Sequence, residues 1–167
     1  DPDVLFLAEA FTRPRVMERL AAIGFHQSYT YFTWRPDPAE LRQYAMELDS
    51  SAPMMRPNFW PNTPDILPEH LQFGGRAAFQ VRLVLAATLA ASYGIYSGYE
   101  LCENQALPGR EEYLNSEKYE ARPRDWRQPG NLTGLITSVN AIRRENPALH
   151  RNDRLRFHPV DNDQLIA

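Results

Sequence analysis

The sequence predicts an α/β fold with a parallel sheet, namely the C-terminal half of a (β/α)8 barrel followed by the start of an all-β domain. Four apolar runs alternate with four helical patterns, and repeated strand–helix units imply parallel strands. A closed eight-unit barrel needs about 250 residues, so four units in roughly 150 residues amount to half of one. An open doubly wound sheet also fits this length, but the G-x-G-x-x-G turn expected after its first strand is absent.

The first two strand–helix units lie in the N-terminal third of the chain. The continuous apolar run Val4–Ala8 predicts a strand buried on both faces, and a helix from Pro14 to Gly24 follows it. Aromatic and hydroxylated residues predict a second strand over residues 27–34. Asp37, followed by Pro38, predicts the start of the second helix.

The third unit contains a long loop between its strand and its helix, and a fourth unit follows. Residues 54–59 predict a third strand, and the proline-rich residues 60–75 predict a loop of a length that is usually functional. A largely apolar helix over 76–91, a short strand over 94–96 and an amphipathic helix over 132–146 complete the pattern.

The last residues differ from those before them. Leu155 and Phe157 alternate with charged residues, and a turn at 161–163 follows, which predicts a β-hairpin. We therefore expect two domains, a half barrel over 1–150 and the first strands of a truncated β domain over 151–167.

Composition narrows the classes of partner. The net charge of −3 and pI near 5.8 argue against nucleic acid and anionic membranes, and the longest apolar stretch is far shorter than the roughly 20 residues of a membrane span. Cys102 is the only cysteine, and the four histidines lack ligand spacing, so we expect no disulfide and no metal site. We expect a cytoplasmic protein. Because the chain opens with Asp1 and lacks an initiator methionine, we interpret it as a fragment.

Candidate chemistry lies where the predicted strands end, since the active site of a parallel barrel lies at that end. Glu9 ends the first strand, residues 31–34, three of them aromatic, end the second, and Asn62 and Asp65 lie in the loop after the third. Two carboxylates from different strands can converge there. Taken alone, such carboxylates are more often helix caps or salt-bridge partners, and the aromatic residues more often pack in the core than bind sugars.

Five segments together resemble a known family: LFLAEAFTRP, QSYTYFTW, RPNFWPNTPDIL, GIYSGYELCEN and EEYLNSEKYE. They are similar to bacterial maltose-1-phosphate maltosyltransferases, which belong to the α-amylase clan of retaining α-glycoside enzymes. The resemblance implies transfer of maltosyl units from maltose 1-phosphate to the non-reducing ends of α-1,4-glucans, with no cofactor. For the full-length protein we expect a homodimer.

The resemblance also implies roles for four residues. Glu9 matches the general acid/base, and Asp65 matches the carboxylate that stabilises the transition state. Lys118 and Tyr119 match a pair that contacts the donor.

The nucleophilic aspartate of the family belongs on a strand that would precede Glu9. Asp3 cannot replace it, because six extended residues place Asp3 roughly 20 Å from Glu9, whereas retaining enzymes need about 5 Å between the two carboxyl groups. We therefore predict that the isolated chain has no transferase activity.

Two other interpretations stay open. A hydrolase or trehalose-forming enzyme of the same clan commonly carries Asn-His-Asp where this chain has Asn62-Thr63-Pro64-Asp65, a difference that favours a phosphate-linked donor. A non-catalytic carbohydrate-binding or subunit-contact fragment would keep the aromatic residues and dispense with the acid.

Overall fold

The sheet is parallel and has four strands. A computed structural model describes residues 3–116 and 121–167 of the chain. The strands lie in the order β1-β2-β3-β4, with β1 at Leu7–Ala8, β2 at Gln27–Tyr29, β3 at Pro57–Phe59 and β4 at Ser92–Tyr93. Each strand pairs with the next one along the chain, so Ala8 lies opposite Ser28, and Tyr29 opposite Asn58. The predicted α/β class with a parallel sheet is thus confirmed.

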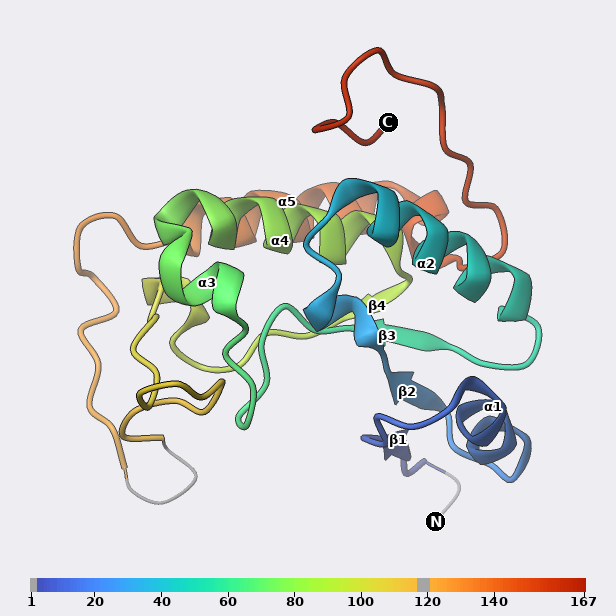
Figure 1. Ribbon diagram of the computed structural model, residues 1–167, viewed down its shortest axis with the longest axis horizontal. Helices are drawn as coiled ribbons and strands as arrows, with labels where there is room; N and C mark the ends of the chain where they lie inside the picture. Colours follow the sequence, from blue (N-terminus) through green and yellow to red (C-terminus); the bar gives the residue numbers. More distant parts are fainter. Residues whose placement is uncertain (1–2, 117–120) are drawn as a thin grey trace.

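The described residues form five α-helices. They are α1 (Pro14–Ala22), α2 (Pro38–Ser51), α3 (Glu69–Phe73), α4 (Gly75–Leu89) and α5 (Thr133–Glu145). Helices α4 and α5 lie side by side and, with α2, cover one side of the sheet, whereas α1 lies beside β1 and β2 (Figure 1). As the sequence predicts, Asp37 caps α2, accepting hydrogen bonds from the N–H groups of Ala39 and Glu40 at 2.9 and 3.0 Å.

The strands are shorter than predicted. Residues Tyr31–Trp34, expected to extend the second strand, form a 3-10 turn. The fourth strand occupies Ser92–Tyr93 rather than 94–96. The loop over 60–75 contains helix α3, which the three prolines of this loop obscured in the sequence.

The prediction that Val4–Ala8 is buried on both faces is wrong. Ala8 is buried, but the side chains of Val4, Leu5, Phe6 and Leu7 are 43, 68, 55 and 42% exposed. The reason is that β1 is an edge strand, paired only with β2. An apolar run alone cannot distinguish a central strand from an edge strand.

Two clusters of buried side chains form the core. The first lies between α1, α2, β3 and α4, where the rings of Phe32 and Phe59 stack with centroids 4.5 Å apart. The second lies between α3, α4, α5 and the turn Tyr99–Leu101 and centres on the fully buried Tyr99. Helix α4 contributes to both clusters through one face, whereas Val81 and Val84 on its other face are 55 and 40% exposed.

The segment 151–167 contains no strand in the part of the chain that the structure describes. One backbone hydrogen bond joins its two limbs, from the N–H of His158 to the carbonyl oxygen of Ala167 at 2.7 Å. The segment is tied to α2 where the N–H of Leu155 donates to the carboxylate of Asp49 at 3.1 Å. The truncated β domain and its boundary at residue 150 remain predictions.

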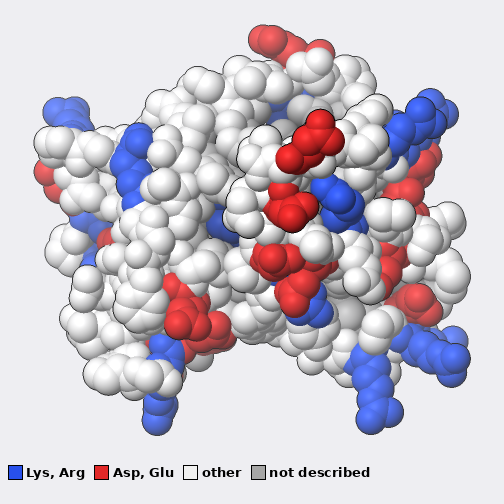
Figure 2. Space-filling model, turned by 45° about the horizontal axis from the view of Figure 1, so that its top comes forward, with Lys and Arg blue, Asp and Glu red and all other residues white. Residues whose placement is uncertain are grey.

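The surface offers no region of a single sign on the face drawn in Figure 2, where acidic and basic side chains are interspersed. Among the described residues, no helix has both the length and the apolar character needed to cross a bilayer.

Candidate active site

The four strands end at one edge of the sheet, and the residues that follow them meet there. Glu9 comes directly after β1 and is exposed, Thr30 follows β2, Trp60 follows β3, and Gly94 follows β4. Parallel strands point the same way, so these four positions form one row across the sheet. This is the edge where the sequence predicts chemistry.

Glu9 lies near an aromatic pair from the two neighbouring strands. Burial raises the pKa of the Tyr29 hydroxyl above its ordinary value, and the negative charge of Glu9 raises it further. The ring of Tyr29 stacks on the indole of Trp60, with centroids 4.9 Å apart and planes 26° apart. The structure therefore brings the predicted acid/base together with a flat aromatic surface.

The absence of a side chain at Gly94 leaves room for the Trp60 indole. A Cβ atom at position 94 would lie 2.3 Å from the nearest ring carbon of Trp60, closer than van der Waals contact allows. Only glycine lets β4 run this close to the ring. The four strands thus cooperate in building the edge around Glu9.

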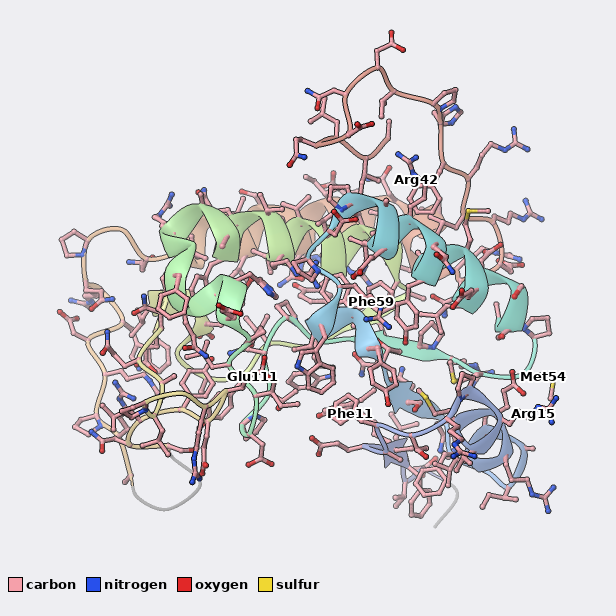
Figure 3. All side chains as sticks on the ribbon, in the orientation of Figure 1. Phe11, Arg15, Arg42, Met54, Phe59 and Glu111 are labelled. Carbon is pink, nitrogen blue, oxygen red and sulfur yellow. The ribbon has the colours of Figure 1, made fainter. Side chains whose placement is uncertain are left out.

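A second group of aromatic side chains lies beside this row. The Phe11 ring meets the Trp34 indole edge to face at 4.9 Å and the Tyr31 ring at 5.9 Å. The indole N–H of Trp34 donates to Oε2 of Glu111 at 2.7 Å, although the two residues are 77 positions apart. Phe11 and Glu111 approach the Tyr31–Trp34 turn from different sides (Figure 3).

Asp65 lies in a tight turn after β3. Thr63 and Ile66 exchange backbone hydrogen bonds of 3.0 and 3.2 Å, and the N–H of Asp65 donates to the hydroxyl of Thr63 at 3.2 Å. The side chain of Asp65 is exposed at the tip of this turn. Since neighbouring strands lie about 4.8 Å apart, the ends of β1 and β3 are separated by about 10 Å. Glu9 and Asp65 thus follow strands that have only β2 between them.

Hydrogen bonds of Asn62 hold the loop just before this turn. It is fully buried, its Nδ2 donates to the hydroxyl of Tyr113 at 2.6 Å, and its Oδ1 accepts from the N–H of Tyr96 at 3.1 Å. Burial raises the pKa of the Tyr113 hydroxyl, so this hydroxyl stays protonated and can accept from the amide. Asn62 therefore has a structural role here, three residues before Asp65.

Lys118 and Tyr119, the predicted donor contacts, lie outside the described residues. The residues that precede and follow this part of the chain are packed or hydrogen-bonded. Ser116 is buried, and the guanidinium of Arg124 binds both carboxylate oxygens of Glu103, at 2.8 and 3.2 Å. Arg122 approaches the same carboxylate at 3.6 Å.

Arg82 is a residue of this region that the sequence did not reveal. It lies in α4, is 3% exposed, and holds its guanidinium 3.8 Å from the centroid of the Phe32 ring. Its amino groups donate to the carbonyl oxygens of Phe32 and Arg35, the latter at 2.8 Å. Arg82 thereby fixes the turn that carries Trp34. A single charge on the core-facing side of an otherwise apolar helix was the available signal.

The described part of the chain contains no group of side chains that could bind a metal ion. Across residues 3–116 and 121–167, no three histidine, cysteine, aspartate or glutamate side chains are grouped so that they could hold a metal ion. The edge instead combines exposed carboxylates with aromatic rings, a combination suited to binding and acid/base chemistry on sugars.

Comparison with known proteins gives a match along the whole chain. No family model matches the sequence. It is 62% identical over 173 residues to alpha-1,4-glucan:maltose-1-phosphate maltosyltransferase 2 of Streptomyces coelicolor, covering 100% of this chain and 26% of that protein. The corresponding Rhodospirillum rubrum protein is 62% identical over 99% of this chain, and that of Corynebacterium glutamicum is 54% identical over 100%.

The resemblance to maltosyltransferases is confirmed. The chain spans about a quarter of the length of the curated relatives that it matches. The comparison shows that this chain is similar to a segment of maltosyltransferases. It does not by itself show the activity of the whole enzyme.

Proposed function

We propose that this chain is the part of a retaining maltosyltransferase that carries the general acid/base Glu9 and the transition-state carboxylate Asp65. In that enzyme it would form the C-terminal half of the catalytic barrel. The donor would be maltose 1-phosphate, and the acceptor the non-reducing end of an α-1,4-glucan. The single observation that supports this most is the position of Glu9, exposed at the carboxyl edge of the sheet beside the Tyr29–Trp60 pair.

The proposed reaction has two steps. In the first, a nucleophilic carboxylate attacks the anomeric carbon, the bond from this carbon to the phosphate oxygen breaks, and phosphate leaves with the electron pair while Glu9 protonates it. In the second, the Glu9 carboxylate removes the proton from an acceptor hydroxyl, whose oxygen displaces the enzyme carboxylate from the anomeric carbon. The nucleophile would come from outside residues 1–167.

The position of Asp65 supports its assigned role. A turn with two backbone hydrogen bonds holds it, and the buried amide of Asn62 fixes the loop just before this turn. A carboxylate that projects from a fixed backbone can stabilise the positive charge that develops on the sugar ring in the transition state. Lys118 would add a cation for the donor phosphate.

The decisive experiment places this chain in a complete enzyme. A chimera is made in which it replaces the matching segment of the Streptomyces coelicolor relative, and release of phosphate from maltose 1-phosphate is measured with glycogen as acceptor. We expect transfer by the chimera and none by the isolated chain. Glu9→Gln should lower kcat of the chimera by at least about 100-fold, since the acid/base contributes to both steps.

The matched control is Glu18→Gln in α1, which removes one carboxylate and changes the net charge by the same amount as Glu9→Gln. It should leave kcat unchanged. Unaltered turnover in the Glu9→Gln chimera would refute the assignment and favour a binding role. Release of free maltose in place of glucan extension would favour the hydrolase interpretation.

A further inference from the structure

A cavity of about 390 Å³ lies between the Tyr31–Trp34 turn and helix α3. Its volume is in the range of small-ligand sites, about 300–1,000 Å³. Its walls include the side chains of Trp34, Pro68, Glu69, His70, Phe73 and Glu111. None of these residues has a role in the mechanism above.

Hydrogen bonds hold the walls of this cavity in place. The Trp34 indole is tied to the carboxylate of Glu111, and the carbonyl oxygen of Glu111 accepts from the N–H of Leu67 at 2.5 Å. The amide of Gln72 in α3 donates to the carbonyl oxygens of Leu67 and Arg110, at 2.8 and 3.0 Å. Because three distant segments are joined in this way, the cavity is formed before any ligand binds.

The charge of the residues that line the cavity favours a neutral ligand over an anionic one. It includes two carboxylates, Glu69 and Glu111, and no lysine or arginine among the described residues that line it. Burial and the nearby charge of Arg82 lower the pKa of His70 to about 4, so this side chain is neutral near pH 7. A phosphorylated sugar would be repelled, whereas a neutral polyhydroxyl chain can donate hydrogen bonds to the carboxylates.

The aromatic lining suits the apolar faces of sugar rings. Phe73, at the end of α3, is 78% exposed, the largest exposed fraction among the exposed large apolar side chains of the described chain. Trp34 faces the same cavity. Exposed aromatic rings beside carboxylates are the surface that a glucan chain needs.

A chain of aromatic contacts links the cavity to the candidate catalytic edge. Trp34 contacts Phe11, and the Phe11 ring lies 6.4 Å from that of Tyr29, beside Glu9. The same aromatic cluster therefore borders the acid/base on one side and this cavity on the other.

We propose that this cavity binds the acceptor α-glucan, at sugar units remote from the one that receives the maltosyl group. The proposal rests on the proposed function for the identity of the glucan. Phe73 and Trp34 provide faces for sugar rings, and Glu69 and Glu111 accept hydrogen bonds from their hydroxyls.

The test measures binding separately from turnover. Affinity for maltoheptaose is determined by isothermal titration calorimetry on the chimera, and KM for the same acceptor is measured by phosphate release. Phe73→Ala should weaken maltoheptaose binding about five-fold and raise KM by a similar factor, with kcat unchanged. Phe73→Tyr should restore both values because it keeps the ring face. Val81→Ala, on an exposed face of α4 outside the cavity, serves as the control.

The outcomes distinguish the two proposals. If Phe73→Ala binds maltoheptaose as tightly as the parent chimera does, the glucan cavity is wrong, whether or not transfer occurs. If the chimera binds maltoheptaose through Phe73 but transfers nothing, the cavity stands and the catalytic assignment fails. A loss of affinity in Val81→Ala equal to that in Phe73→Ala would also overturn the proposal.

Discussion

Replacing Gly94 by alanine tests how the catalytic edge is built. The new Cβ atom would lie 2.3, 2.4 and 2.6 Å from three ring carbons of Trp60, whereas ordinary contact begins at about 3.4 Å. The indole must therefore move by about 1 Å or more, away from its stack on Tyr29. The φ angle of Gly94 is not positive, so the substitution has no backbone cost of its own.

The expected loss of stability follows from these contacts. Overpacking typically costs about 1–3 kcal/mol, and loss of the Tyr29–Trp60 stack accounts for about 0.5–1.5 kcal/mol of that. Urea denaturation of the 167-residue chain, followed by circular dichroism, measures the free energy of unfolding. In the chimera, Gly94→Ala should also lower kcat, since the aromatic surface beside Glu9 is displaced.

The chain offers a control of opposite sign. A Cβ atom at Gly134, inside α5, would meet nothing within 4 Å. Gly134→Ala should therefore stabilise the chain by about 0.5–1 kcal/mol, because alanine loses less entropy in a helix. If Gly94→Ala is as stable as the parent chain and keeps its near-ultraviolet circular dichroism, the account of this edge is refuted.

Two further substitutions test the buried guanidinium of Arg82 in α4 and the neighbouring imidazole of His70 in α3. Arg82→Met should lower the free energy of unfolding by about 1.5–3 kcal/mol, since hydrogen bonds from a charged group to the carbonyl oxygens of Phe32 and Arg35 are lost; a change below about 0.5 kcal/mol in urea denaturation would contradict this. His70, whose pKa is lowered to about 4 by burial and by Arg82, takes up its proton more readily in the unfolded chain. Stability should thus fall as the pH drops from about 6.5 to 4, by up to about 1 kcal/mol per pH unit, and His70→Gln should flatten this slope; an unchanged slope would show that His70 is not its source.

Four of the five helices in the described chain could be predicted because their signals are local, whereas α3 was missed. A proline in the first turn starts α1 and α2, a cap at Asp37 fixes the second of these, and Asn146-Pro147 ends α5. All three are properties of a few neighbouring residues. They do not depend on what the helix packs against.

The strands were predicted less well because their limits depend on partners. Residues Tyr31–Trp34 have high strand propensity, yet they form a turn whose carbonyl oxygens bind Arg82. That guanidinium comes from α4, 50 residues further along the chain from Phe32. No local pattern near Tyr31 reveals it.

The candidate site divides in the same way. Glu9 could be placed at a strand end and Asp65 in the loop after the third strand from the sequence pattern, but their roles came from the resemblance. The partners of Trp34 and Asn62, which are Glu111 and Tyr113, are 77 and 51 residues away in the sequence. Contacts between residues so far apart form only in the folded chain and leave no local pattern in the sequence.

The exposed apolar residues that lead into the edge strand β1 make a last prediction possible, because Glu9 directly follows this strand. Leu5 is 68% exposed, and an unpaired strand edge with apolar side chains favours association with other chains. Leu5→Lys should therefore leave the free energy of unfolding of the isolated chain within about 0.5 kcal/mol and reduce its aggregation, as measured by light scattering.

In the chimera the Leu5→Lys substitution should lower both stability and activity. If the chain forms half of a barrel there, the apolar edge of β1 is covered by the rest of the enzyme, and a lysine at position 5 would be buried without a partner. Leu5→Lys should then reduce soluble yield and transfer activity together, while Val81→Lys, on the exposed face of α4, should not. Full activity of the Leu5→Lys chimera would mean that this edge stays open to solvent, and the half-barrel arrangement around Glu9 would have to be abandoned.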